Sequence, residues 1–105
     1  MEDIPNIEDL DALRSRVVDM LKERGPEDQE AIDMLIEWTK RKEQEVELNR
    51  TPESEVEFEK ERAQLYLDAG LVDDAKQAFE DAYLLACNLG LEEESHRIAE
   101  KILSL

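Results

Sequence analysis

The stretch from Ala63 to Ala82 constrains the fold more than any other part of this chain, because small and aromatic residues recur there at helical spacing. Its pattern is Ala63-x-x-Tyr66-x-x-x-Gly70-x-x-x-x-Ala75-x-x-x-Phe79-x-x-Ala82. The alanines let two helices approach closely, the aromatic rings fill the space between them, and the glycine ends the first helix in a left-handed conformation. The pattern predicts an antiparallel helix pair with a short turn.

The composition predicts that the rest of the chain is helical as well. The 105 residues contain only three glycines and three prolines, while 41% are hydrophobic and 40% are charged. The hydrophobic residues recur at helical spacing throughout, so the charges belong to helix surfaces. We therefore expect one all-α domain of about five antiparallel helices.

Capping residues and turn formers divide this domain into four segments. Residues 1–5 form a flexible lead, and 6–50 form an N-terminal helical hairpin that begins at the cap Asn6 and turns at Gly25-Pro26. Residues 51–90 form a second hairpin that begins at Thr51-Pro52, and 91–105 form a C-terminal capping helix. Alternating glutamates at 53–59 could indicate a strand, but the proline cap and the continuous downstream pattern favour a helix. Two further expectations are that Trp38 belongs to the core and that the Lys40–Glu47 segment faces water.

The net charge of −16 is shared by both halves of the chain. No cluster of basic residues is available to bind phosphates, so direct nucleic-acid binding is not expected, and an anionic membrane would repel the chain. The acidic surface favours either simple solubility or a basic partner protein.

The sequence also predicts a cytoplasmic location. The N-terminal residues lack the apolar run of a signal peptide, and no apolar run is long enough to span a membrane. The single cysteine, Cys87, cannot form an intramolecular disulfide, and its apolar helical surroundings predict a buried, reduced thiol.

The run Ala63-Gln-Leu-Tyr66-Leu-Asp-Ala-Gly70-Leu-Val-Asp-Asp-Ala75-Lys-Gln-Ala-Phe79-Glu-Asp-Ala82 resembles one tetratricopeptide repeat, a helix-turn-helix unit of 34 residues. The resemblance covers residues 56–90. The chain departs from the family pattern at Glu59 and Arg62, where the family usually has Trp and Leu, and no second copy of the motif is visible. The resemblance implies right-handed helical hairpins, with divergent helices on both sides of the repeat.

The same resemblance implies a function. Repeats of this type resemble protein-binding modules in which the first helix of each pair lines the binding surface. We therefore expect a non-catalytic adaptor that binds a peptide or another protein, with Lys40–Glu47 as a secondary surface. On the exposed face of the first repeat helix, the candidate contact residues are Glu57, Lys60, Gln64, Leu67 and Asp68.

The sequence offers no convincing catalytic or metal-binding pattern. Glu93-x-x-His96 matches half of a dimetal site, but that site needs a second such pair, and His96 is the only histidine. Cys87 and His96 lack an oxyanion loop that would make them a nucleophile and its base. We therefore expect no enzyme activity, no metal and no cofactor.

Two other functions remain open. Acidic arrays could mimic nucleic acid and inhibit a basic protein; they include Glu53, Glu55, Glu57, Glu59, Glu61, Asp73 and Asp74. An exposed apolar strip could instead pair with a second copy, so the chain is expected to be a monomer or a homodimer.

Overall fold

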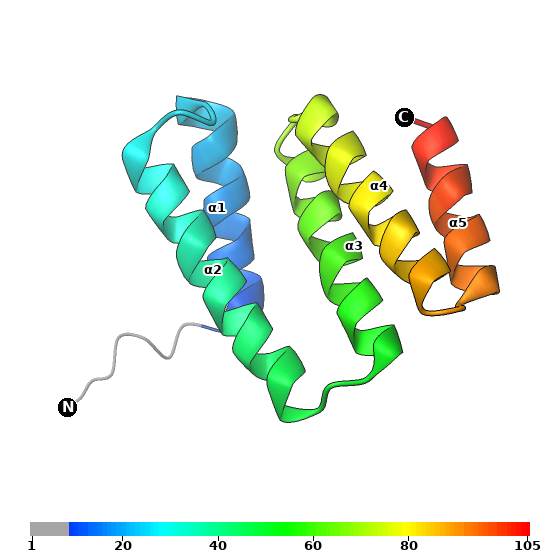
Figure 1. The fold of residues 1–105 in the computed structure, drawn as a ribbon. Coiled ribbons are helices and arrows are strands. Elements are labelled where there is room, and N and C mark those ends of the chain that lie inside the picture. The colour runs from blue at the N-terminus through cyan, green and yellow to red at the C-terminus, as the bar shows by residue number, and fades with distance from the viewer. Residues whose placement is uncertain (1–8) are drawn as a thin grey trace.

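The computed structural model describes residues 9–105, and the chain folds there into helices joined by short turns, with no strand in that range. Figure 1 shows the helices following one another across the molecule, with the first two paired on one side and the last on the other. The all-α prediction is confirmed, including a helix at the alternating glutamates. The helices are α1 (Leu10–Arg24), α2 (Gln29–Leu48), α3 (Pro52–Asp68), α4 (Val72–Asn88) and α5 (Glu92–Leu103).

The first helix begins later than its sequence predicted. Asp9 has an extended backbone, and its side chain accepts a hydrogen bond from the Ala12 backbone N–H at 2.8 Å, so Asp9 is the N-cap. A helix that began at the predicted cap Asn6 would contain Asp9 in its first turn. A side chain that caps a helix cannot also belong to its first turn, so the expected start is wrong. Asn6 and the expected lead at 1–5 lie outside the described residues.

The turn between α1 and α2 extends beyond Pro26, so this proline is not the first residue of α2. Gly25 has a φ of 93°, which ends α1, and its N–H donates to the Leu21 carbonyl. Pro26 lies in the turn, and Asp28 caps α2 by accepting from the Ala31 N–H at 2.9 Å. The two helices pack antiparallel, as predicted (Figure 1).

The start of α3 agrees with its sequence. Thr51 and Ser54 form a capping box, in which each side chain accepts a hydrogen bond from the other residue's backbone N–H, at 3.0 and 2.8 Å. Pro52 occupies the first helical position, where a missing N–H costs nothing.

The turns that follow α3 and α4 have the same geometry. Gly70 and Gly90 have φ values of 83° and 75°. In each turn the residue after the glycine donates its N–H to a carbonyl five residues earlier, Leu71 to Tyr66 and Leu91 to Ala86, both at 2.9 Å. This is the hydrogen-bond pattern of a Schellman motif. α4 therefore follows α3, and α5 follows α4, through the same kind of corner.

The hydrophobic core consists of two clusters that share α3. The first joins α1 and α2 to Leu65 of α3 and to Ala69, which caps the end of α3, and it contains the fully buried Trp38. The second joins the opposite face of α3 to α4 and α5, and Phe79 belongs to it. The expectation that Trp38 belongs to the core is confirmed. α3 separates the two clusters and contributes side chains to both.

Two ion pairs supplement the contact of the first hairpin with α3. Arg14 of α1 lies 2.7 Å from Asp68, and Lys42 of α2 lies 2.9 Å from Glu61. Lys42 belongs to the polar part of α2 that was expected to face water. That part is an ordered helix, and it is exposed apart from a strip that includes Lys42 and Val46.

Cys87 is exposed, so the prediction that its thiol is buried is wrong. The buried face of α4 ends at Ala86. One residue further, the helix has rotated by about 100°, which turns the Cys87 side chain to the surface. None of the helices in residues 9–105 combines the length and the apolar character needed to cross a membrane.

Candidate functional site

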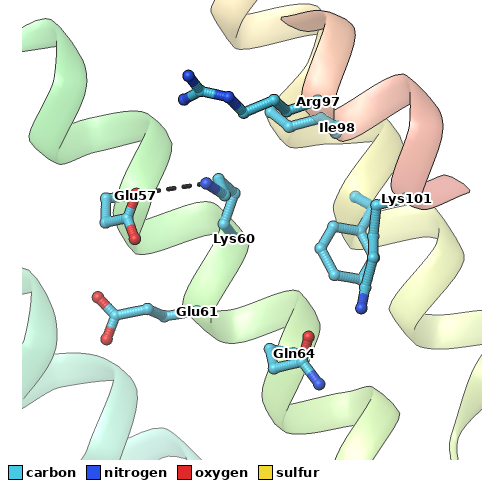
Figure 2. Close-up of a pocket in the computed structure, with 8 residues that line it drawn as sticks. Glu57, Lys60, Glu61, Gln64, Arg97, Ile98 and Lys101 are labelled. Atoms are coloured by element: carbon cyan, nitrogen blue, oxygen red, sulfur yellow. Dashed lines mark hydrogen bonds and ion pairs between the residues drawn. The ribbon is translucent and has the colours of Figure 1, made fainter. Parts of the chain in front are cut away.

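A groove lies between α3 and α5, and Phe79 of α4 contributes to its floor. Its volume is about 380 Å³. Figure 2 shows Arg97 extending from α5 toward α3 across it, while Glu61 points away from α5, toward α2. The lining residues are Glu57, Lys60, Glu61 and Gln64 of α3, Phe79 of α4, and Arg97, Ile98 and Lys101 of α5.

The groove exists because α4 lies between two helices that do not pack against each other. α3 and α5 each pack on α4, and within residues 9–105 their backbones make no direct contact. Small residues let α4 approach both neighbours closely; these are Ala75, Ala78, Ala82 and Ala86, all buried. Phe79 and Ile98 are almost completely buried and make the bottom of the groove apolar.

The spacing of the α3 residues explains why they share this groove. Residues 57, 60, 61 and 64 follow one another at intervals that place them on one stripe of a helix. Glu55 and Glu59 line a different pocket of about 150 Å³, together with Val46 of α2 and Leu85 of α4. Alternate residues on a helix point about 200° apart. The alternating glutamates of α3 are therefore divided between two faces of the molecule.

A second pocket of about 410 Å³ continues the groove toward the N-terminal ends of α3 and α5. The two pockets share Glu57 and Arg97. The additional lining is acidic apart from the backbone corner at Gly90 and Leu91, and it consists of Glu53, Glu92, Glu93 and Glu94.

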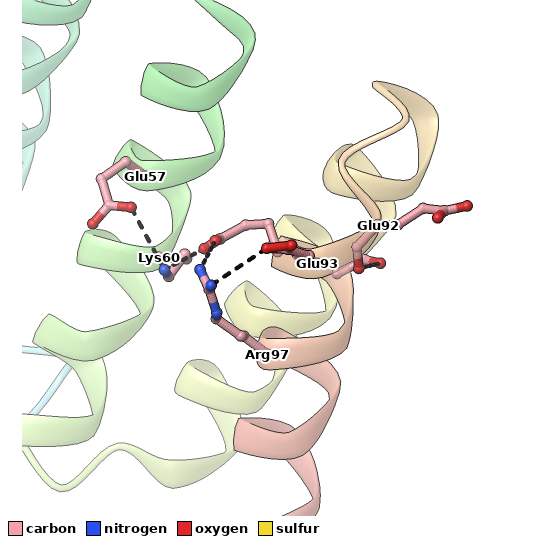
Figure 3. A network of polar contacts seen from close by, with 7 residues as sticks. Glu57, Lys60, Glu92, Glu93 and Arg97 are labelled. Carbon is pink, nitrogen blue, oxygen red and sulfur yellow. Dashed lines mark hydrogen bonds and ion pairs between the residues drawn. The ribbon is translucent and has the colours of Figure 1, made fainter.

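A network of ion pairs connects α3 to α5 across the junction of the two pockets (Figure 3). Lys60 donates a hydrogen bond to Glu94, which lies on α5, and its ammonium is 3.5 Å from Glu57. Arg97 lies 3.2 Å from Glu94 and 3.7 Å from Glu93. Glu94 therefore forms ion pairs with two cationic side chains, Lys60 of α3 and Arg97 of α5.

The network changes the ionisation of its members. The hydrogen bond from Lys60, supported by the nearby charge of Arg97, lowers the pKa of Glu94 below its ordinary value. Burial alone lowers the pKa of Lys60, but the hydrogen bond to Glu94 and the charge of Glu57 outweigh it, so the pKa is raised. Each partner thus favours the charged form of the other.

Three of the five predicted contact residues line the groove. Glu57 is exposed, while Lys60 and Gln64 are half-buried. Leu67 is half-buried against the second core cluster. Asp68 accepts hydrogen bonds from Gln64 at 2.8 Å and from Arg14 at 2.7 Å, so it connects α3 to α1. The Arg14 hydrogen bond lowers the pKa of Asp68, with a smaller contribution from Gln64.

The α5 side of the groove was missed in the sequence. Arg97, Ile98 and Lys101 were interpreted only as parts of a capping helix. One signal was available: residues 51–105 contain five lysines and arginines, and two of them lie one turn apart on α5. Three of these five cations, Lys60, Arg97 and Lys101, line the same groove. Spacing within α5 cannot show that α3 lies opposite, because that depends on how both helices pack on α4.

Of the residues considered for catalysis or metal binding, Glu93 lines the pocket that continues the groove, whereas His96 and Cys87 lie apart from the lining. His96 is exposed on α5, and Cys87 is exposed on α4, where it interacts with the Tyr83 hydroxyl and raises the pKa of that tyrosine. Within residues 9–105, no group of three or more potential ligand side chains is placed to hold a metal ion.

No protein-family model matches this chain, and comparisons with curated proteins and with solved structures find no match.

Proposed function

We propose that this chain is a non-catalytic protein-interaction module that binds a peptide segment of another protein in the groove between α3 and α5. The observation that carries the proposal is the groove itself, which has an apolar floor and polar walls on two separate helices. Grooves of this kind suit a peptide, because the floor accepts an apolar side chain while the walls fix its orientation.

The resemblance of residues 56–90 to a tetratricopeptide repeat supports the same proposal. In such repeats the first helix of each pair lines the binding surface. α3 is the first helix of the pair that resembles the repeat, and α5 follows the pair through an identical corner. α5 then has the place of the first helix of a following pair, as α3 has in its own pair, and the groove lies between these two helices.

The chemistry of the lining supports a binding role. The residues around the groove supply carboxylates, cations, one amide and apolar side chains, and they include no serine, cysteine or histidine that could act as a nucleophile or base. The carboxylates and cations at its centre are paired with each other, which leaves them suited to recognition.

The proposal is tested by selecting peptides from a random-peptide phage library on the folded protein and mapping them by 15N NMR titration. We expect the largest shift changes at the amides of residues 57–64 and 97–101. A double variant, Gln64→Ala with Lys101→Ala, should bind the selected peptides about thirtyfold more weakly, since each of the two lost polar contacts costs about 1 kcal/mol.

The matched control is Lys76→Ala with Gln77→Ala on the exposed side of α4. Gln77 donates to Asp81 four residues later, just as Gln64 donates to Asp68. This control should bind like the wild type. Equal losses in both double variants, or shift changes on α1 and α2 instead, would contradict groove binding. Lys60 is left unchanged because its loss would also weaken the link between α3 and α5.

A further inference from the structure

The groove between α3 and α5 has opposite charge at its two ends. The two helices run in the same direction (Figure 1), so their N-terminal ends meet at one end of the groove. That end is lined by Glu53, Glu57, Glu92 and Glu93. The other end is lined by Gln64 and Lys101.

Unpaired charges are present at both ends. Within residues 9–105, Lys101 has no ion-pair partner, although it belongs to a chain with a net charge of −16. Glu53 and Glu92 likewise have no cation partner in that part of the chain, and Figure 3 shows Glu92 pointing away from the Lys60–Arg97 network. These three charges are free to be matched by charges on a ligand.

The centre of the groove separates these charges with an apolar surface. Phe79 and Ile98 form its floor, and the cations beside them, Lys60 and Arg97, are already occupied by glutamates. A ligand there meets apolar atoms and neutralised ion pairs, so an apolar side chain is favoured at this position.

Resting on the proposed function, we infer that the groove selects a peptide with a basic residue at one end, an acidic residue at the other, and an apolar residue between them. The two charged residues should be about four positions apart. The unpaired Glu92 and Lys101 are separated by about 13.5 Å along α5 at the rise of an α-helix. An extended peptide covers that distance in about four residues.

Charge complementarity argues for this occupant over a uniformly basic or a uniformly acidic one. A uniformly basic peptide would place a cation against Lys101, and a uniformly acidic one would place a carboxylate among four glutamates. Like charges that face each other across an interface weaken the binding of a wrong partner. The groove therefore discriminates between peptides by repulsion as well as by attraction.

The experiment extends the phage selection. Peptides that bind the wild type and lose binding to the Gln64→Ala, Lys101→Ala double variant are sequenced, and basic–apolar–acidic spacing is scored. One such peptide is then measured by fluorescence anisotropy against Lys101→Glu. Its affinity should fall about fivefold, because the charge reversal replaces an attraction worth up to about 1 kcal/mol by a repulsion.

Reciprocal exchange makes the test specific. When the acidic residue of the peptide is changed to lysine, binding to Lys101→Glu should recover, whereas binding to the wild type should fall. Lys76→Glu is the control, because it makes the same charge change on the exposed side of α4 and should alter neither affinity. Circular dichroism checks that each variant is folded.

The outcomes separate this inference from the proposed function. Enrichment of the charge pattern with reciprocal recovery supports both. Groove-dependent peptides that lack the pattern, or that show no recovery, overturn the inference and leave groove binding intact. A selection without any groove-dependent peptide overturns the proposed function, and the inference falls with it.

Discussion

Glu94 is the residue that most directly holds α5 against α3, since it accepts a hydrogen bond from Lys60 and lies 3.2 Å from Arg97. Its side chain is 20% exposed and that of Lys60 is 29% exposed. Partly buried, doubly paired carboxylates contribute more to stability than fully exposed ones, because water screens them less. The free energy of unfolding should therefore depend on the ionisation of Glu94.

The Glu94→Gln variant should reveal this dependence. The pKa of Glu94 is lowered in the folded state, so its contribution is present above the ordinary value of 4.5 and is lost as the pH falls through the lower, folded pKa. At pH 7 the variant should be less stable than the wild type by about 1 kcal/mol. This difference should shrink steadily once the pH drops below about 4.5.

Urea denaturation of both proteins between pH 7 and pH 3 measures that difference. The comparison cancels the general effect of acid on a chain with a net charge of −16, because both proteins share it. A difference that does not change with pH would show that Glu94 acts through packing and not through its charge.

Single residues also show where sequence patterns reach their limit. Trp38 could be placed in the core because it occupies the apolar stripe of its helix. Cys87 was wrongly placed there because its neighbours Leu85 and Leu89 are apolar, although Leu89 is itself 37% exposed. Each residue of a helix points about 100° away from the one before it, so apolar neighbours in the sequence do not by themselves make a position buried. The boundary is set by packing, which the sequence does not contain.

At the level of elements, the corners after α3 and α4 provide a pair of equivalent test sites. Both glycines have positive φ, and a Cβ added at either would meet nothing within 4 Å. Any cost of adding a side chain there is therefore conformational and not steric. Gly70→Ala and Gly90→Ala should each destabilise the protein by about 1–2 kcal/mol, the cost of a left-handed backbone for an L-residue.

Thermal unfolding followed by circular dichroism measures both variants. Gly70→Asn and Gly90→Asn are the controls and should cost less, because asparagine tolerates the left-handed conformation better than alanine. A large loss at one corner with none at the other would contradict their equivalence.

Helix boundaries were predictable wherever a local signal decides them. Thr51-Pro52 and the glycines at 70 and 90 marked the right positions, since capping and left-handed turns depend on a few adjacent residues. The start of α1 could not be predicted in this way, because asparagine and aspartate are both good caps and the sequence alone does not choose between Asn6 and Asp9. The division of the α3 glutamates between two faces follows from helix geometry, but which neighbours they face depends on tertiary packing.

For the whole molecule, the two core clusters predict two levels of local stability. Within residues 9–105, the backbone contacts that join the α1–α2 hairpin to the remaining helices are all with α3, and Leu65, Ala69 and the ion pairs of Arg14 and Lys42 lie at this junction. α3, α4 and α5 share the second cluster. Segments with less shared core open at lower free energy. Amide hydrogens of α1 and α2 should therefore exchange faster than those of α3 and α4.

The Leu65→Ala variant should widen this gap. Leu65 is fully buried in the first cluster, so its truncation should cost about 2–5 kcal/mol. Hydrogen-exchange mass spectrometry should show protection falling more in α1 and α2 than in α4 and α5. Val56→Ala is the control, because Val56 is equally buried in the second cluster and should affect α4 and α5 more. Uniform loss in both variants would indicate a single cooperative unit.

The helical architecture could be predicted from periodicity and turn residues, whereas only one wall of the groove could be predicted. Its α3 wall lies on a stripe that the sequence displays, and Glu57, Lys60 and Gln64 were found that way. Its α5 wall, with Arg97 and Lys101, depends on the relative placement of two helices separated by α4. No local pattern encodes that placement.

The order in which the helices pack also bears on how fast the chain folds. Each helix packs on the next one along the chain, and within residues 9–105 the contacts that pass over a helix are those of α1 with α3 and the ion pair that joins α3 to α5. Ordering such a chain closes mainly short loops, and the entropy lost at each closure is small. Helical proteins with local contacts of this kind fold in microseconds to milliseconds. Folding can begin at the α3–α4 corner and proceed outward in both directions, with each arriving helix packing mainly on its neighbour.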